Sequence, residues 1–115
     1  MQKDKTIQQL VDHLTGMFGA DHFIVRDYWD SDLCAIGFEN FGSTSLLYVN
    51  TYNKAPQQFY LELENISVFG SHSVSQRIDN VTLNQVEDYM RRFIIGPTPW
   101  KVVKFVNKRT TKYSY

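Results

Sequence analysis

Apolar residues recur three and four positions apart over residues 5–18, which is the spacing of one face of a helix. Asp4 precedes this segment as an N-cap, because its side chain can accept a hydrogen bond from the first helical turn. Gly19 is suited to end the helix. His13 lies on the flank of the apolar face and is expected to be solvated. The residues predicted to be buried are Ile7, Leu10, Val11, Leu14 and Phe18.

A second helix with the same spacing is predicted over residues 83–95. Thr82 and Gln85 have the spacing of a capping box at its start, and Gly96-Pro97 would end it. The residues predicted to be buried are Leu83, Val86, Met90, Phe93 and Ile94. The charged residues expected to face water are Glu87, Asp88, Arg91 and Arg92.

Between the two helices, apolar and polar residues alternate, as they do in half-buried strands. The four alternating runs are residues 23–29, 33–39, 44–52 and 58–64. Their connections are short and rich in turn residues, so each run can pair only with its neighbour, in antiparallel direction. A further strand is predicted over residues 100–106, whereas residues 65–80 have no clear pattern. Residues 107–115 are expected to form a basic tail that is flexible or extends a sheet edge.

These elements predict one α+β domain over residues 1–115, a four- to five-stranded antiparallel meander with both helices on one face. Alternation assigns an apolar set to the covered face, where Cys34 would act as a small hydrophobe. That set is Phe23, Val25, Cys34, Ile36, Phe38, Leu47, Val49, Phe59, Leu61 and Leu63.

The opposite face is assembled from the expected hairpin registers. Its three rows are Tyr28–Leu33–Asn50–Tyr60, Arg26–Ala35–Tyr48–Glu62 and Ile24–Gly37–Leu46–Glu64. The small residues Ala35 and Gly37 would leave a shallow trough with tyrosine walls and an acidic edge. Such a face is too apolar to be merely solvated. Either the C-terminal segment or a partner is expected to cover it.

Charge is unevenly distributed along a chain whose formal net charge is zero. Five of the twelve basic residues stand in residues 101–115, where there is no acid, so residues 1–100 carry seven basic and twelve acidic residues. A negative body argues against direct nucleic-acid binding. The single cysteine fits a reducing compartment, and neither an apolar leader nor a membrane-length apolar run is present. A cytoplasmic protein that does not contact membranes is therefore expected.

The segment DYWDSD, residues 27–32, is predicted to be an acidic hairpin tip, and its chemistry is open to several interpretations. It lacks the glycine and the distal glutamate of a calcium loop. The histidines, at positions 13, 22 and 72, form no zinc motif, although spacing alone does not exclude a two-histidine nuclease. Glycine-rich phosphate loops and nucleophile elbows are absent from the sequence. We therefore expect no metal, no cofactor and no enzymatic activity.

What the sequence does offer is an acidic and aromatic surface. Carboxylates can take the place of phosphates against Lys and Arg, and tyrosine rings can fill base-stacking sites, so this surface is complementary to a basic, nucleic-acid-processing protein. The residues predicted to bind such a partner are Asp27, Tyr28, Trp29, Asp30, Asp32, Glu39, Tyr48, Tyr60, Glu62 and Glu64.

The order of elements resembles that of small bacterial immunity proteins of contact-dependent growth inhibition and polymorphic toxin systems. The segments that carry the resemblance are the N-terminal helix, DLCAIGFEN, TSLLYVNTY, QQFYLELEN and VTLNQVEDYMRRFI. The resemblance implies a cytoplasmic, non-enzymatic inhibitor, a monomer or weak homodimer, that blocks one cognate toxin domain, often a nuclease. Two alternatives stay open: a small enzyme or ligand-binding domain that uses the trough, and a dimer that buries the trough against its own copy.

Overall fold

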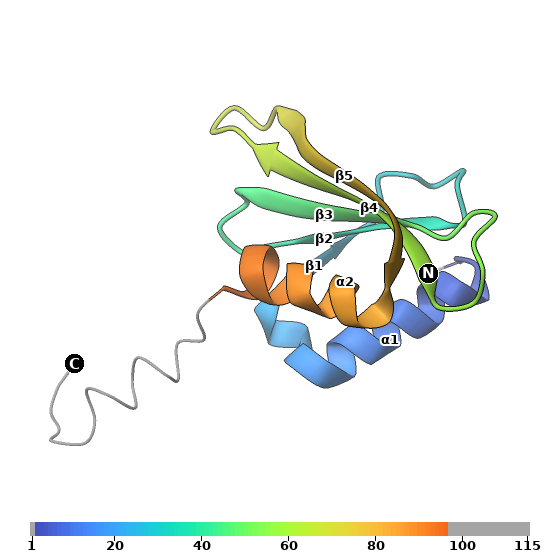
Figure 1. Ribbon diagram of the computed structural model, residues 1–115. Helices are drawn as coiled ribbons and strands as arrows, with labels where there is room; N and C mark the ends of the chain where they lie inside the picture. Colours follow the sequence, from blue (N-terminus) through green and yellow to red (C-terminus); the bar gives the residue numbers. More distant parts are fainter. Residues whose placement is uncertain (1, 97–115) are drawn as a thin grey trace, which may run out of the picture.

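The computed structural model describes residues 2–96, and its central feature is a five-stranded antiparallel sheet (Figure 1). The strands are β1 (Ile24–Arg26), β2 (Ala35–Glu39), β3 (Ser45–Asn50), β4 (Gln58–Ile66) and β5 (His72–Thr82). Each strand pairs with the next in the chain, in the order β1-β2-β3-β4-β5. The predicted α+β class and the meander are therefore confirmed. The predicted strand over residues 100–106 and the tail 107–115 lie outside the described residues.

Two helices cover one face of this sheet (Figure 1). The first, α1 (Lys5–Phe18), is followed by a short 3-10 helix, η1 (Ala20–His22). The second, α2 (Leu83–Tyr89), continues as a π-helix, η2 (Met90–Ile95). The expected caps are present: the Asp4 side chain accepts from the Thr6 amide, and Thr82 and Gln85 form a reciprocal capping box. Gly19 and Gly96 stand after the helices with φ of +88° and +65°, where a residue with a Cβ would be strained.

The hydrophobic core fills the space between the helices and the covered sheet face, and it contains most of the residues that alternation assigned to it. Its largest fully buried side chain, Phe38, packs edge-to-face on Phe23 with ring centroids 5.7 Å apart. The buried residues of the core are Ile7, Leu10, Leu14, Phe23, Ile36, Phe38, Leu47, Val49, Phe59, Leu61, Leu63, Val81, Val86, Met90 and Ile94.

Two members of the predicted core set are placed differently. Val25 is 37% exposed, because β1 is a short edge strand that the helices do not fully cover. Cys34 precedes β2 instead of lying within it, and it is only half buried. A third prediction, that Glu87 faces water, is also wrong. Its side chain is 10% exposed, because it is held against His13.

The predicted registers of β1–β2 and β2–β3 are wrong by two residues, whereas that of β3–β4 is correct. Gly37, not Ala35, lies between Arg26 and Tyr48. The turn after β2 sits one residue later than expected, because the Asn40 amide donates to the Ser45 carbonyl. A shift of two residues leaves every side chain on its predicted face. The predicted assignment of side chains to the two sheet faces is therefore correct, whereas the predicted cross-strand rows are not.

The region that gave no clear pattern, residues 65–80, forms the end of β4, a turn and most of β5. Most β5 side chains are exposed, because the strand lies at the sheet edge and extends beyond the helices (Figure 1). Its pairing with β4 contains register shifts at two points. Alternation is a weak guide to a strand that buries few of its side chains and is interrupted by bulges.

Candidate partner-binding surface

Aromatic side chains cross the sheet face that the helices leave uncovered. We call Tyr60, Tyr48, Trp29 and Tyr28 the aromatic row. Successive ring centroids in this order lie 6.4, 5.0 and 5.6 Å apart, all edge-to-face. The ring of His72, the first residue of β5, continues the row, 6.1 Å from Tyr28. The row therefore links residues from β3, β4, β5 and the connection between β1 and β2.

Trp29 fills the trough that the sequence predicted on this face. A Cβ added to Gly37 would lie 3.0 Å from two carbons of the Trp29 indole and 3.0 Å from Leu46 Cδ1. Ala35 and Leu46, although on the uncovered face, have no exposed surface. Trp29, from the chain's own β1–β2 connection, thus covers part of the trough that the C-terminal segment or a partner was expected to cover.

That connection, residues 27–34, is held in place by Lys3, to which the sequence assigned no role. The Lys3 Nζ lies 2.7 Å from Asp27 Oδ1 and donates to the carbonyls of Trp29 and Asp32 at 3.0 and 2.9 Å. These three acceptors match the three N–H donors of an ammonium group. Only 1% of the Lys3 side chain is exposed. We call residues 27–34, fixed in this way, the Lys3-bound loop.

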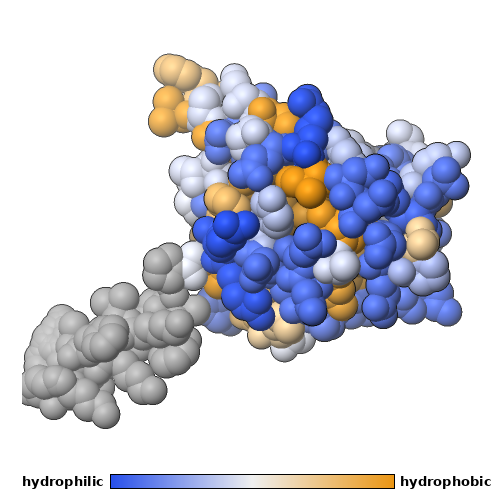
Figure 2. Space-filling model, viewed as in Figure 1, coloured by the Kyte–Doolittle hydropathy of each residue, from blue (hydrophilic) through white to orange (hydrophobic). Residues whose placement is uncertain are grey.

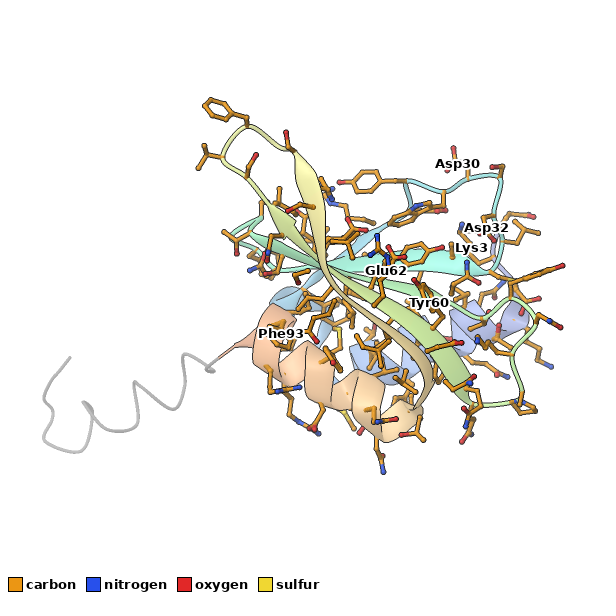
Figure 3. The ribbon with its side chains drawn as sticks, turned by 45° about the horizontal axis from the view of Figure 1, so that its top comes forward. Lys3, Asp30, Asp32, Tyr60, Glu62 and Phe93 are labelled. Atoms are coloured by element: carbon orange, nitrogen blue, oxygen red, sulfur yellow. The ribbon has the colours of Figure 1, made fainter. Side chains whose placement is uncertain are left out.

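The three aspartates of DYWDSD have different environments. Asp27 pairs with Lys3, and Asp32 accepts from the Cys34 amide at 3.0 Å and from Asn50 Nδ2 at 3.2 Å. Asp30 is exposed and lies on the outside of the loop, away from Lys3 (Figure 3). The segment is therefore not a projecting hairpin tip. It folds back over the sheet and leaves Asp30 as its free carboxylate among the described residues.

The carboxylates of the predicted acidic edge already have basic side chains of the same face as partners. Glu62 lies 3.7 Å from Arg77, and Glu64 lies 2.8 Å from His72. Glu39 is bound by Arg26 at 3.2 Å and by the Ser43 hydroxyl at 2.9 Å, and only 4% of its side chain is exposed. The prediction that Glu39 belongs to an exposed acidic surface is therefore wrong. It instead holds Arg26 in place over the sheet.

Ionisation of these groups follows their surroundings. Burial raises the pKa of the Glu39 carboxyl, but the bonds from Arg26 and Ser43 outweigh burial and leave this pKa below its usual value. The hydrogen bond from the Tyr60 hydroxyl to Glu62, 2.6 Å long, raises the pKa of Tyr60 to about 12. Burial raises the pKa of Tyr48. At neutral pH these shifts keep Glu39 ionised and keep Tyr48 and Tyr60 protonated, which are the states in which the bonds described above form.

A separate cavity of about 250 Å³ lies on the helix side of the molecule. It is bordered by one stripe of α1, by the β3–β4 connection, by the start of β4 and by Leu83. Its basic residues already have partners: His13 Nε2 lies 2.7 Å from Glu87 Oε2, and Lys54 is paired with Asp79. Gln57, also in its wall, has a φ of +57°, which is strained for a residue other than glycine or asparagine.

The structure does not bring the three histidines together. His13 is on α1, His22 is in η1, and His72 is beside Tyr28 on the opposite side of the sheet. Within residues 2–96, no group of three or more His, Cys, Asp or Glu side chains is gathered as a metal site would require. No helix in the described part of the chain has the length and apolarity needed to span a membrane.

Sequence reasoning found the aromatic residues of this surface but missed the residues that position them. No local sequence pattern predicts the contacts of Lys3, which stands two positions before α1. The same holds for the basic residues of β1 and β5, which are Arg26, His72 and Arg77. In comparisons with known proteins, no family model, no curated protein and no solved structure matches the chain.

Proposed function

We propose that this protein is an inhibitor that binds a cognate toxin domain, a nuclease, and blocks its basic active cleft. The observation that carries the proposal is the Lys3-bound loop, which is fixed on a sheet face that no helix covers. It presents Tyr28, which is 59% exposed, beside Asp30. A surface that is already ordered loses little conformational entropy when it binds, which favours a tight protein complex.

The interface expected from the structure differs from the broad acidic surface that the sequence predicted. Because Glu39, Glu62 and Glu64 already have basic side chains of this chain as partners, a broad acidic surface is not available to a partner protein. Asp30 is left to meet a basic group, and charges at an interface rim mainly set the association rate. Aromatic contacts supply most of the affinity in such interfaces. Tyr28, at the exposed end of the aromatic row, is therefore the expected contact.

The experiment that tests this proposal pairs the protein with the toxin domain encoded immediately upstream of its gene. Co-expression should restore growth, and the purified protein should abolish cleavage of RNA or DNA at equimolar ratio. The double variant Tyr28→Ala/Asp30→Lys should fold but protect poorly. The proposal fails if a tenfold excess of the wild-type protein leaves cleavage at its full rate.

The second candidate function is binding of a small ligand. The cavity on the helix side favours it, whereas the trough on the uncovered face is filled by Trp29. Because His13 and Lys54 are already paired with carboxylates, the cavity suits a small uncharged molecule with hydrogen-bonding groups. Its volume of about 250 Å³ is just below that of drug-sized pockets, ~300–1,000 Å³. Titration of labelled protein with the four ribonucleosides, followed through the amides of Gln9, Thr51 and Gln57, tests this alternative. Unchanged amide shifts at millimolar nucleoside would reject it for this class of ligand.

A further inference from the structure

The turn that joins β4 to β5 is closed by an ordered set of hydrogen bonds. We call Ser67–Gly70 the β4–β5 turn. The Gly70 amide donates to the Ser67 carbonyl at 2.9 Å, and the Ser67 amide donates to the Ser71 carbonyl at 2.8 Å. The Ser67 hydroxyl oxygen accepts from the amides of Phe69 and Ser71 at 3.3 and 3.1 Å. With Gly70 at φ +83°, the turn has the backbone of a well-formed hairpin.

The two central residues of this turn are unusual for their position. Val68 is 95% exposed and Phe69 is 92% exposed, more than any other large apolar residue in the described part of the chain. Central turn positions normally carry Gly, Pro, Asn, Asp or Ser, and a β-branched valine has a strong preference for strands. Figure 2 shows apolar atoms at the end of a projection that stands clear of the body. Val68 and Phe69 therefore depart from the usual composition of a turn without any burial that would stabilise the fold. Such departures are expected at functional sites.

The β4–β5 turn lies next to the end of the aromatic row. His72, which follows the turn at the start of β5, contacts the Tyr28 ring and pairs with Glu64. The aromatic row therefore leads from the middle of the sheet through Tyr28 to the base of the hairpin. A partner that contacts Tyr28 would meet Val68 and Phe69 at the border of the same surface.

We propose that Val68 and Phe69 are an anchor that inserts into an apolar cavity of the protein partner bound by the uncovered sheet face. This inference rests on the proposed function and adds the chemistry of the partner. The anchor requires a cavity that accepts a phenyl ring and an isopropyl group. The near neighbours of the turn along the chain include Asn65, Ser71 and Ser73, and the nearest acid, Glu64, is already paired with His72. The rim of the cavity is therefore expected to carry uncharged hydrogen-bonding groups.

A protein fits this anchor better than a lipid bilayer does. Binding to an anionic bilayer combines apolar insertion with a cluster of lysines and arginines. Between Glu64 and Gln76 the sequence contains neither lysine nor arginine. Two side chains bury far less area than the ~1,200 Å² or more of a stable interface, so a contact through the turn alone would not hold a second copy of the chain. The remaining area of a stable complex must come from the aromatic row.

The variant Val68→Ser/Phe69→Ser tests the anchor by calorimetric titration with the toxin domain encoded upstream. It should weaken binding at least about thirtyfold, as loss of a hot-spot aromatic does. Its unfolding midpoint should stay unchanged, because both side chains are exposed. Met17→Ser, which removes a half-exposed apolar side chain from α1, is the matched control and should bind like wild type. Ser67→Ala keeps both side chains but loosens the turn, so it should weaken binding by a smaller factor.

The possible outcomes separate this inference from the proposed function. If the wild-type protein binds and the double-serine variant binds equally well, the anchor is overturned and the proposed function stands. If the wild-type protein does not bind, both are overturned. Sedimentation with neutral and anionic vesicles completes the test. Binding to vesicles that is lost in the double-serine variant would assign the turn to a membrane and overturn the protein anchor.

Discussion

The Trp29 indole lies directly over Gly37, so that a Cβ on Gly37 would stand only 3.0 Å from the indole carbons Cη2 and Cζ3. Gly37 pairs with Arg26 on one side and Tyr48 on the other. The absence of a side chain at this point therefore lets the Lys3-bound loop pack against the centre of the sheet. The contact joins the fold of the sheet to the geometry of the candidate partner-binding surface.

We expect Gly37→Ala to push the Trp29 side chain away from the sheet and to lower the free energy of unfolding by about 1–3 kcal/mol, as overpacking does. Trp29 emission should shift to the red in a Trp100→Phe background. Gly42→Ala is the matched control, because a Cβ there would meet nothing within 4 Å. Unchanged emission and stability in Gly37→Ala would show that Trp29 is not held against the sheet in solution.

Removal of the Lys3 ammonium should release the loop without unfolding the core. Lys3→Met leaves Asp27 and two carbonyls without their donor, which we expect to cost about 1–3 kcal/mol. Hydrogen exchange should speed up at the amides of residues 29–35 more than at those of β3. Lys5→Met, at an exposed position on α1, should change neither quantity. Equal exchange in both variants would contradict the anchoring role of Lys3.

Tyr60 should report alkaline pH. In the unfolded chain a tyrosine loses its proton near pH 10, whereas the folded protein holds the Tyr60 proton until about pH 12. The stabilising effect of this bond is therefore complete below pH 10 and is lost as pH rises through 12. Absorbance at 295 nm should show a late tyrosine ionisation that disappears in Tyr60→Phe and moves to lower pH in Glu62→Gln. A late ionisation that persists in Tyr60→Phe would assign it to another residue.

The pair formed by His13 and Glu87 should hold α1 against α2. His13→Ala leaves the nearly buried Glu87 carboxylate without its partner, which should cost about 1–3 kcal/mol. Glu87→Gln combined with His13→Ala should cost less than the sum of the two single variants, because the charge that needs the partner is gone. Urea unfolding measures all three. Additive costs would show that the two residues are independent. His22→Ala, at an exposed position, is the control.

The sequence predicted what depends on local periodicity, namely both helices, their caps, the meander and the face of nearly every strand residue. Prediction from the sequence failed where a single long-range contact determines the local structure. The Asn40–Ser45 bond sets a β2–β3 register that differs from the predicted one. The Lys3 bonds hold the expected hairpin tip as a loop on the sheet. Spacing along the chain placed Glu62 and Glu64 on the uncovered face but did not show that Glu39 is buried. The basic partners of these carboxylates, Arg26, His72 and Arg77, come from other strands, and spacing along one strand does not reveal them.

Asp30 and Asp32 should respond differently to charge reversal, although they are two positions apart in one acidic segment. Asp30 is exposed, so Asp30→Lys should leave the unfolding midpoint unchanged. It should slow association with a basic toxin domain, because an exposed charge acts mainly through long-range attraction. Added salt, which weakens the attraction by Asp30 in the wild type, should instead weaken the repulsion by Lys in the variant. Dissociation should change little.

Asp32 accepts from the Cys34 amide and from Asn50, so Asp32→Lys removes two bonds that fix the Lys3-bound loop. It should lower the free energy of unfolding by about 1–3 kcal/mol and raise the dissociation rate, because the loop no longer holds its binding geometry. Surface plasmon resonance at two salt concentrations, combined with urea unfolding of both variants, separates the two effects. If Asp30→Lys destabilises the protein and Asp32→Lys does not, the exposure assigned to Asp30 and the hydrogen bonds assigned to Asp32 are wrong.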